Sequence, residues 1–209
     1  MPRILITSGP TRQYLDPVRY LTNSSSGRMG SALATAALEL GHEVVVISGP
    51  VEVEYPGAAQ VLSVVSTEEM LACARDTFKE CDGLISAAAP CDYRPLHIEQ
   101  SKIAKTGEPL LLKLVETEDV VATLGANKGR RWVVGFALET EDHRLRALAK
   151  LERKCCDLIV SNGVEAMRAL DNQVEILDAA GKVLRSALGS KLSVAREILA
   201  VIQQRLIEG

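Results

Sequence analysis

The chain has 209 residues, of which 47% are hydrophobic and 24% charged, and its formal net charge is −3. This length can bury one sizeable core, so we expect a single domain over residues 1–209. The acidic balance and the scarcity of aromatic residues exclude a basic or base-stacking surface for nucleic acid. No apolar run approaches 18 residues and no signal-peptide pattern opens the chain, so we expect a cytoplasmic protein.

Apolar runs of strand length alternate with helical patterns along the whole chain. This alternation predicts an α/β fold: a three-layer, Rossmann-like, mostly parallel sheet with helices on both faces. A turn signal between residues 174–177 and 183–186 predicts a C-terminal β-hairpin arm, and residues 11–26 lack periodicity, which is typical of a functional loop. We expect strands at 3–7, 42–48, 60–65, 83–88, 110–115, 132–137 and 158–161, and helices at 27–40, 66–80, 118–127, 140–155 and 191–207.

The first strand and the first helix are both flanked by small polar residues. Ser8, Gly9 and Thr11 follow the strand, and Ser26 and Gly27 open the helix. Free N–H groups at a helix N-terminus favour phosphate or carboxylate, although a serine-rich turn and helix cap would have the same composition. The segment is neither GxGxxG nor a P-loop, and Ser48-Gly49-Pro50 stands where a dinucleotide site needs an acidic residue. An NAD(P)-binding reductase is therefore disfavoured.

Further polar residues lie in loops and on one helix. Arg19 and Asn23 have the chemistry to hold a carboxylate or a polar substrate. Ala88 ends the fourth strand, where a small residue permits close approach of a ligand, and Asp92 follows where a ligand or Mg²⁺ would lie. Lys102 and Lys105, spaced by three in a loop, could neutralise a triphosphate. Lys150 and Lys154 form an i,i+4 pair on one face of a helix. Each of these residues also has a purely structural interpretation. The loop residues could simply be exposed to solvent, the segment with Asp92 could be a tight turn, and the helical lysines could lie on a solvated face. The three histidines are scattered and no carboxylates are paired, so the sequence shows no obvious nucleophile or general base. Catalysis would then depend on positioning the reactants and neutralising charge, with a nucleotide supplying the activation.

Five segments together resemble the bacterial phosphopantothenoylcysteine synthetase (phosphopantothenate–cysteine ligase) family. They are ILITSGPTRQYLDPVRYLTNSSSGRMG (4–30), SAAAPCDYRP (86–95), SKIAK (101–105), VGFALET (134–140) and KLERKCCDLIVSN (150–162). The resemblance implies a ligase of coenzyme A biosynthesis that joins 4′-phosphopantothenate to cysteine through an acyl-cytidylate, releasing CMP and pyrophosphate. It implies CTP, with ATP left open, and Mg²⁺ held mainly by the nucleotide phosphates.

The resemblance also implies roles for individual residues. Asn23, Lys102 and Arg19 match catalytic or supporting positions of the family. The nucleotide site would include Asp92, Glu118, Asp119, Val120, Val121, Phe136, Lys150 and Lys154, and the 174–186 hairpin would be the arm of a homodimer. Three departures stand out: Ala104 replaces a lysine, Glu118 a proline, and Pro90-Cys91 a Val-Ala-like pair.

Many family members are fused to an N-terminal flavoprotein decarboxylase. Nothing precedes the ligase motif in this chain, so we expect no flavin site, and the decarboxylase would be a separate chain or a removed domain. A reductase on the same fold and a non-catalytic nucleotide-binding relative are the alternative functions.

Overall fold

The centre of the molecule is an eight-stranded sheet with the order β12-β11-β10-β9-β6-β1-β4-β5. The computed structural model describes residues 1–139, 143–163 and 172–209. All neighbouring strands of the sheet are parallel except for the pairs β10–β11 and β11–β12. This confirms the predicted α/β fold with a mostly parallel sheet. The strands are β1 (Arg3–Ser8), β4 (Glu43–Ser48), β5 (Gln60–Ser63), β6 (Gly83–Ser86), β9 (Trp132–Glu139), β10 (Leu158–Gly163), β11 (Asn172–Asp178) and β12 (Val183–Gly189).

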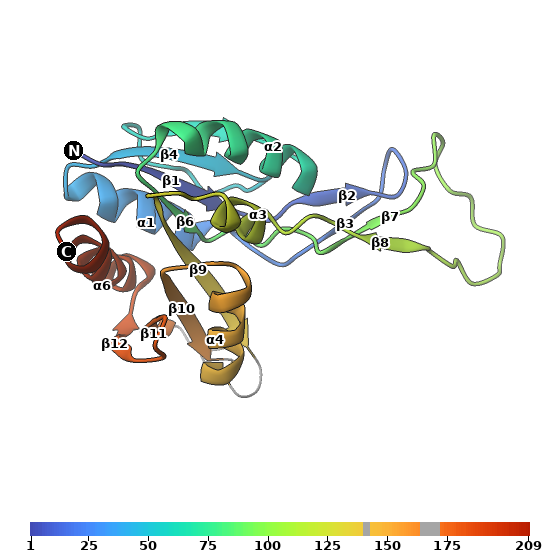
Figure 1. Ribbon diagram of the computed structural model, residues 1–209. Coiled ribbons are helices and arrows are strands. Elements are labelled where there is room, and N and C mark those ends of the chain that lie inside the picture. Colours follow the sequence, from blue (N-terminus) through green and yellow to red (C-terminus); the bar gives the residue numbers. More distant parts are fainter. Residues whose placement is uncertain (140–142, 164–171) are drawn as a thin grey trace.

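Helices cover both faces of this sheet (Figure 1). Successive strand residues point to opposite faces, so β1 serves two cores. Ile4 packs with Leu33 and Ile198 in one core, whereas Leu5 packs with Met70 in the other. One face is therefore covered by α1 and α6, and the other by α2, α3 and α4. Their bounds are α1 (Arg28–Glu39), α2 (Thr67–Thr77), α3 (Val120–Ala126), α4 (His143–Arg153) and α6 (Lys191–Ile202), with short turns η1 (Phe78–Glu80) and η2 (Gln203–Ile207).

A narrow arm of two small antiparallel sheets projects from this body (Figure 1). One sheet pairs β2 (Arg12–Tyr14) with β3 (Tyr20–Thr22), and the other pairs β7 (Tyr93–Pro95) with β8 (Leu114–Glu116). The loop predicted over residues 11–26 therefore contains a hairpin. It escaped prediction because its strands have three residues each and mix polar with aromatic side chains.

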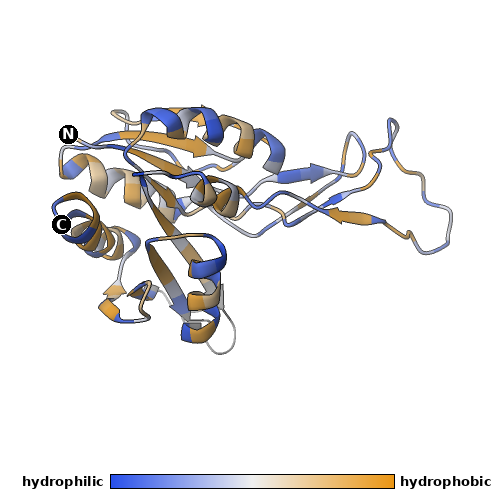
Figure 2. Cartoon of the chain, viewed as in Figure 1, coloured by the Kyte–Doolittle hydropathy of each residue, from blue (hydrophilic) through white to orange (hydrophobic). Residues whose placement is uncertain are grey.

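The strand predicted at residues 110–115 was wrong as a member of the buried sheet. Only Leu114–Glu116 is a strand, and it lies in the arm. Leu110 and Leu111 are 56% and 90% exposed. Figure 2 shows hydrophobic residues on β8, well away from the hydrophobic strands of the central sheet. A short apolar run resembles a core strand in sequence even where the fold leaves it exposed.

The predicted C-terminal hairpin is present as β11 and β12, and it extends the central sheet because β11 pairs with β10. The predicted helix over 140–155 is observed as α4, although residues 140–142 lie outside the described part of the chain. Within the described ranges, no helix is long and apolar enough to cross a membrane.

Candidate functional site

The chain reverses its direction across the sheet beside β1. It passes from β1 through α1 to β4 and β5 on one side, then returns to β6 on the other side of β1. In open α/β sheets such a reversal leaves a crevice beyond the carboxyl ends of the strands. A cleft of about 1330 Å³ lies there, lined by the segment before α1, the loop after β6, the segment before α3, and side chains of α4.

The start of α1 forms one wall of the cleft. Gly27 precedes the helix with φ 72°, and no side chain caps the helix N-terminus. A Cβ on Gly27 would lie 3.0 Å from both Val51 and Val53, and a Cβ on Gly30 only 2.0 Å from Ser8 Oγ. The two glycines thus let the helix start sit directly on the end of β1, with its first N–H groups beside the cleft. Such groups favour an anion.

Two cations stand beside this helix start. Arg28 begins α1 and Lys191 begins α6, and both side chains line the cleft. Burial and then the charge of Arg28 hold the pKa of Lys191 below its ordinary value. Like charges that face each other in a cleft favour a bound anion between them, because an anion relieves their repulsion.

The loop after β6 forms the floor of the cleft, and Asn23 is attached to it. Asn23 Nδ2 donates to the carbonyl oxygens of Pro90 (2.8 Å) and Ala89 (3.3 Å). The carboxamide orientation is therefore fixed by the loop backbone. Asp92 is exposed at the end of the same loop, and its carbonyl oxygen accepts from Thr117 N–H at 2.9 Å.

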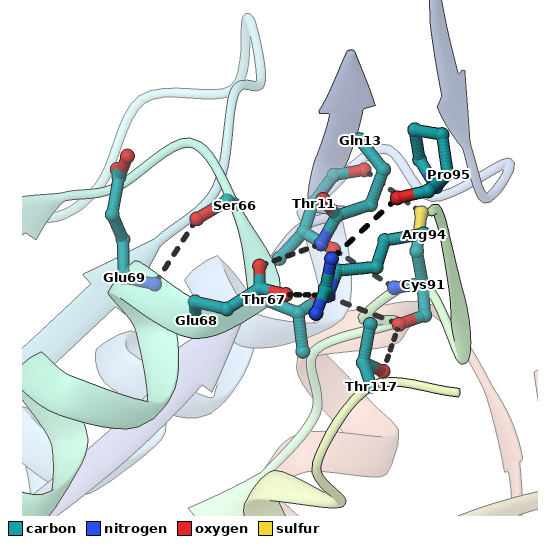
Figure 3. Close-up of polar contacts among 10 residues, drawn as sticks. All are labelled: Thr11, Gln13, Ser66, Thr67, Glu68, Glu69, Cys91, Arg94, Pro95 and Thr117. Carbon is teal, nitrogen blue, oxygen red and sulfur yellow. Dashed lines mark hydrogen bonds and ion pairs between the residues drawn. The ribbon is translucent and has the colours of Figure 1, made fainter. Parts of the chain in front are cut away.

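A polar cluster around Cys91 joins this floor to the arm (Figure 3). Thr11, Thr67 and Thr117 surround the backbone of Cys91. Further out, Glu68 on α2 accepts from Gln13 Nε2 of β2 at 2.8 Å and pairs with Arg94 Nε of β7 at 3.2 Å. The cluster therefore attaches one strand of each arm sheet to α2.

The opposite wall is built by α3 and α4. Asp119 caps α3 by accepting from Ala122 N–H at 3.0 Å, and it also pairs with Lys154 Nζ at 2.9 Å. Burial acts to raise the pKa of Asp119, but the Ala122 N–H and the Lys154 ammonium together hold it below its ordinary value. Glu118 pairs with Arg75 Nη2 of α2 at 3.6 Å. Both carboxylates beside α3 are therefore charge-compensated.

The structure brings most of the sequence-predicted residues into this one cleft. Whether each of them binds a ligand stays a prediction. Those that line it are Asn23, Ser26, Gly27, Ala88, Asp92, Glu118, Asp119, Val120, Val121, Phe136, Lys150 and Lys154.

Three predicted binding residues lie just outside the lining. Ser8 and Thr11 are fully buried. Ser8 Oγ donates to Gly27 O at 3.2 Å, and Thr11 Oγ1 accepts from Cys91 N–H at 2.8 Å. Gly9 has φ 75° and lies against Val51 and Gly49. These residues support the lining from below, and direct ligand contact by them stays a prediction.

Two predicted catalytic residues, Arg19 and Lys102, do not line the cleft of their own chain. Arg19 Nη2 donates to Ile103 O at 3.0 Å, and Arg19 Nη1 pairs with Asp16 Oδ2 at 3.2 Å. Asp16 Oδ2 also accepts from Ile103 N–H at 3.1 Å. The residue after Lys102 is thus held by both its backbone groups to the turn between β2 and β3, out on the arm.

Sequence reasoning missed several residues that line the cleft. Arg28 lies inside the first motif, directly after Gly27, and could have been found from its place at the helix start. Arg153 and Asn162 likewise lie inside the motif at 150–162. Thr67, Thr117 and Lys191 carry no comparable sequence signal, because only the fold brings them to the cleft.

Comparison with known proteins identifies relatives of this chain. The family model described as the C-terminal domain of DNA/pantothenate metabolism flavoproteins matches residues 2–206. The coenzyme A biosynthesis bifunctional protein CoaBC of Vibrio vulnificus (strain YJ016) is 40% identical over 207 residues, which cover 96% of this chain and 51% of that protein. The protein of the same name from Bacillus subtilis (strain 168) is also 40% identical, with 95% and 50% covered. The chain spans about half the length of these curated relatives.

Solved structures agree with the sequence matches. A crystal structure of the C-terminal domain of CoaBC is 36% identical, covers 100% of this chain and 97% of its own, and has a TM-score of 0.86. A Cab2 variant in complex with phosphopantothenate-cysteine has a TM-score of 0.82 at 17% identity, with 99% and 87% covered. At that identity the second structure shows a shared fold only.

Proposed function

Because the chain belongs to the family of DNA/pantothenate metabolism flavoprotein C-terminal domains, we propose that it is a CTP-dependent ligase that joins 4′-phosphopantothenate to L-cysteine in coenzyme A biosynthesis. One observation carries the proposal. A single cleft at the point where the strand order reverses gathers Asn23, Asp92 and the Asp119–Lys154 pair. Segments that are remote in sequence thus meet where this fold class binds its ligands.

The proposed reaction has two steps. An oxygen of the 4′-phosphopantothenate carboxylate attacks the α-phosphorus of CTP, forming a new P–O bond and breaking the bond to the leaving pyrophosphate. The cysteine amine then attacks the acyl carbon of the acyl-cytidylate. The C–O bond to CMP breaks, an amide bond forms, and the amine loses a proton. A carboxylate is a poor electrophile until it carries such a leaving group, so the nucleotide supplies the activation and the protein supplies alignment and charge.

The cleft walls support this division of labour. The uncapped start of α1, with Arg28 and Lys191 beside it, suits the negative charge of the triphosphate. The Asn23 carboxamide is held by the Pro90 carbonyl, which leaves its oxygen to accept from the substrate or the acyl intermediate. Mg²⁺ would be held mainly by nucleotide phosphates, and the exposed Asp92 carboxylate provides an oxygen ligand of the kind that Mg²⁺ prefers.

The decisive experiment is a pyrophosphate-release assay. The chain is incubated with Mg²⁺, 4′-phosphopantothenate, cysteine and either CTP or ATP, and each component is omitted in turn. We expect release with CTP that depends on phosphopantothenate, and phosphopantothenoylcysteine by mass spectrometry only when cysteine is present. Nucleotide binding without pyrophosphate release would instead support a non-catalytic relative. Faster release with ATP would correct the base preference alone.

Two substitutions test the residues. Asn23→Asp places a carboxylate against two carbonyl oxygens, and Lys102→Gln removes a charge. We expect each to reduce product formation by about 100-fold or more while the fold is retained, which is the scale of removing one charge-stabilising group. Asn127→Asp and Lys79→Gln are matched controls, because both side chains lie outside the cleft. Wild-type turnover in both site variants would place the chemistry elsewhere.

We further propose that the chain acts as a homodimer through the arm of β2, β3, β7 and β8. The 174–186 hairpin, to which the resemblance gave this role, is instead part of the central sheet as β11 and β12. Large apolar side chains are exposed there, including Val18 (59%), Ile98 (56%) and Leu111 (90%). Such side chains on one projection are typical of an interaction surface. Lys102 lies on the same arm and does not line the cleft of its own chain. In a dimer that pairs through the arm, Lys102 of one chain could reach the cleft of the other.

The dimer makes a prediction about mixed variants. Asn23→Asp and Lys102→Gln chains, each inactive alone, should regain activity when mixed, because one of the two clefts in a mixed dimer would contain both native residues. Sedimentation of the wild type should give twice the chain mass. A monomer at assay concentration, or no recovery on exchange between confirmed dimers, would contradict this arrangement.

A further inference from the structure

Three threonine hydroxyls hold the backbone of Cys91, and we call Thr11, Thr67 and Thr117 the threonine clamp (Figure 3). Cys91 N–H donates to Thr11 Oγ1 at 2.8 Å. Cys91 O accepts from Thr67 Oγ1 at 3.1 Å and from Thr117 Oγ1 at 2.7 Å. Thr11 is 0% and Thr67 2% exposed, so the bonds to these two residues are sheltered from water.

The direction of every bond in the clamp follows from proton counting. A hydroxyl donates one hydrogen. Thr67 gives its hydrogen to Cys91 O, so the 2.8 Å contact between Thr11 Oγ1 and Thr67 Oγ1 must use the hydrogen of Thr11. A closed ring results, from Cys91 N–H to Thr11, from Thr11 to Thr67, and from Thr67 back to Cys91 O. Removal of the hydroxyl of either Thr11 or Thr67 would break two bonds of this ring.

Cys91, which the clamp holds, directly follows the residues that hold Asn23. The main acceptor of the Asn23 amide is the carbonyl of Pro90, the residue before Cys91. From the other side, Thr22 Oγ1 donates to Thr11 O at 2.8 Å, immediately before Asn23. Thr11 therefore connects the loop that carries Asn23 to the loop that orients it.

Asp92 is fixed by the same device. Thr117 donates from its hydroxyl to Cys91 O and from its N–H to Asp92 O. Asn23 and Asp92 belong to different segments, and both depend on the position of Cys91. Asn23 bonds the carbonyl of the preceding residue, Pro90, and Asp92 O bonds Thr117, whose hydroxyl also holds Cys91 O. The Pro90-Cys91 pair thus has dedicated partners in this chain.

We infer that Thr67, on α2, is a positioning residue for the ligase reaction, acting through Cys91 to set the Asn23 acceptors and Asp92; the inference rests on the proposed function. The helix does not need this hydroxyl for its own start, since Ser66 caps α2 by accepting from Glu69 N–H. The Thr67 side chain reaches instead to the loop after β6. Its hydrogen-bonding role is therefore directed at the floor of the cleft.

Matched substitutions test the inference. Thr67→Val keeps the shape and removes the hydroxyl, whereas Thr67→Ser restores it. We expect Thr67→Val to lower kcat about tenfold, with the Kd for CTP unchanged within about twofold, because the substitution loosens one buried bond network and removes no charge from the cleft. Thr67→Ser should return kcat to within about threefold of the wild type. Thr35→Val removes a comparable hydroxyl bond within α1 and should leave kcat unchanged.

Hydrogen exchange of the Cys91 amide gives a readout that does not depend on activity. Thr67→Val should accelerate this exchange, and Thr67→Ser and Thr35→Val should not. Wild-type kcat in Thr67→Val, or equal loss in the valine and serine variants, would overturn the inference, as would unchanged Cys91 exchange. A wild-type chain that releases no pyrophosphate would contradict the proposed function. In that case hydrogen exchange of the Cys91 amide and the Kd for CTP, compared between variants, would still show whether the clamp orders the cleft floor.

Discussion

Lys154, the residue directly after α4, and Asp119, at the start of α3, form an ion pair of 2.9 Å across one wall of the cleft. Lys154 has a side chain that is only 15% exposed, so its charge is held at the cleft with little freedom. Asp119 has a second task, because the same carboxylate caps α3 through Ala122 N–H. The pair therefore couples the position of a cleft cation to the start of a helix.

Lys154→Met should weaken nucleotide binding. We expect the Kd for CTP to rise roughly tenfold, which corresponds to the loss of one charge-assisted hydrogen bond of about 1.5 kcal/mol. Isothermal titration calorimetry with CTP alone, without the other substrates, measures this Kd directly. Lys128→Met is the matched control, because Lys128 pairs with Asp157 at 2.6 Å outside the cleft. Equal CTP affinity in the two variants would contradict a nucleotide role for Lys154.

The same substitution should change the response to acid. The pKa of Asp119 is held below its ordinary value of 3.8, so its contribution to stability is present above that pH and is lost as the pH falls below it. Without Lys154 the pKa of Asp119 should rise, and acid unfolding of Lys154→Met should begin at a higher pH than in the wild type. Acid titration followed by circular dichroism checks this. Identical acid midpoints would contradict the coupling.

Asp16→Asn should loosen the loop that carries Lys102. Asp16 is 0% exposed, and its oxygens accept from Val18, Arg19 and Ile103 N–H groups. Burial acts to raise the pKa of Asp16, but these bonds and the Arg19 charge hold it below its ordinary value. An asparagine would direct N–H groups at one of these donors. We expect kcat to fall about tenfold with CTP affinity unchanged.

Hydrogen exchange at Ile103 gives the structural readout for this variant. It should accelerate in Asp16→Asn, because the bond from Ile103 N–H to the carboxylate is weakened. Asp178→Asn is the matched control, since Asp178 also accepts from two backbone N–H groups, those of Ala180 and Lys182, but in the distant C-terminal hairpin. Slower turnover in the control to the same degree would indicate a general loss of stability.

The sequence was sufficient for elements whose burial is continuous. The segment His42–Ser48 reads as a buried parallel strand because five successive apolar or small residues follow Glu43, and β4 occupies Glu43–Ser48. The same reasoning failed at 110–115, because leucines on an exposed arm have the composition of a core strand. Burial is set by partners that a single segment does not contain.

For the candidate site, the short loops at strand ends could be predicted from the sequence. The residues that hold those loops in place through hydrogen bonds could not. Gly27 and Asp92 stand at strand or helix boundaries, where parallel sheets place ligands. Thr67 reads as the first residue of a capped helix, and its contact with Cys91 depends on how α2 lies against β1 and the loop after β6. Hydrogen bonds between remote segments have no local pattern, so the threonine clamp could not be found from the sequence.

Gly30→Ala should destabilise the chain although it adds a good helix former. Alanine in place of glycine inside a helix normally stabilises by up to about 1 kcal/mol. Here the new Cβ would lie 2.0 Å from Ser8 Oγ and 2.4 Å from Ser8 Cβ, so α1 must move from the end of β1. We expect a net loss of about 1–3 kcal/mol in the free energy of unfolding.

Chemical denaturation of Gly30→Ala and Gly57→Ala separates the clash from the substitution itself. Gly57 has no atom within 4 Å of the position of a new Cβ, so its variant should stay within about 0.5 kcal/mol of the wild type. Stability of Gly30→Ala equal to that of the wild type would show that Ser8 yields without cost.

Two buried thiols should make the fold sensitive to alkali. Burial raises the pKa of Cys81 from 9.0 to about 11 and that of Cys156 to about 12. A raised pKa means that the folded state keeps the proton longer than the unfolded state. The stability that each thiol contributes is therefore fully present below pH 9 and is lost as the pH rises toward 11 to 12. We expect the free energy of unfolding to fall by about 1–2 kcal/mol per thiol between pH 8 and 10.5.

Cys81→Ala separates this effect from the cost of removing a buried side chain. The variant should be less stable than the wild type at pH 8, yet lose less stability on the way to pH 10.5, because one of the two thiols no longer ionises. Urea denaturation under reducing conditions at the two pH values gives both numbers. Cys155→Ala removes an exposed thiol and leaves both buried thiols in place, so its variant should keep the wild-type difference. Parallel pH curves for wild type and Cys81→Ala would place the alkaline sensitivity in other groups.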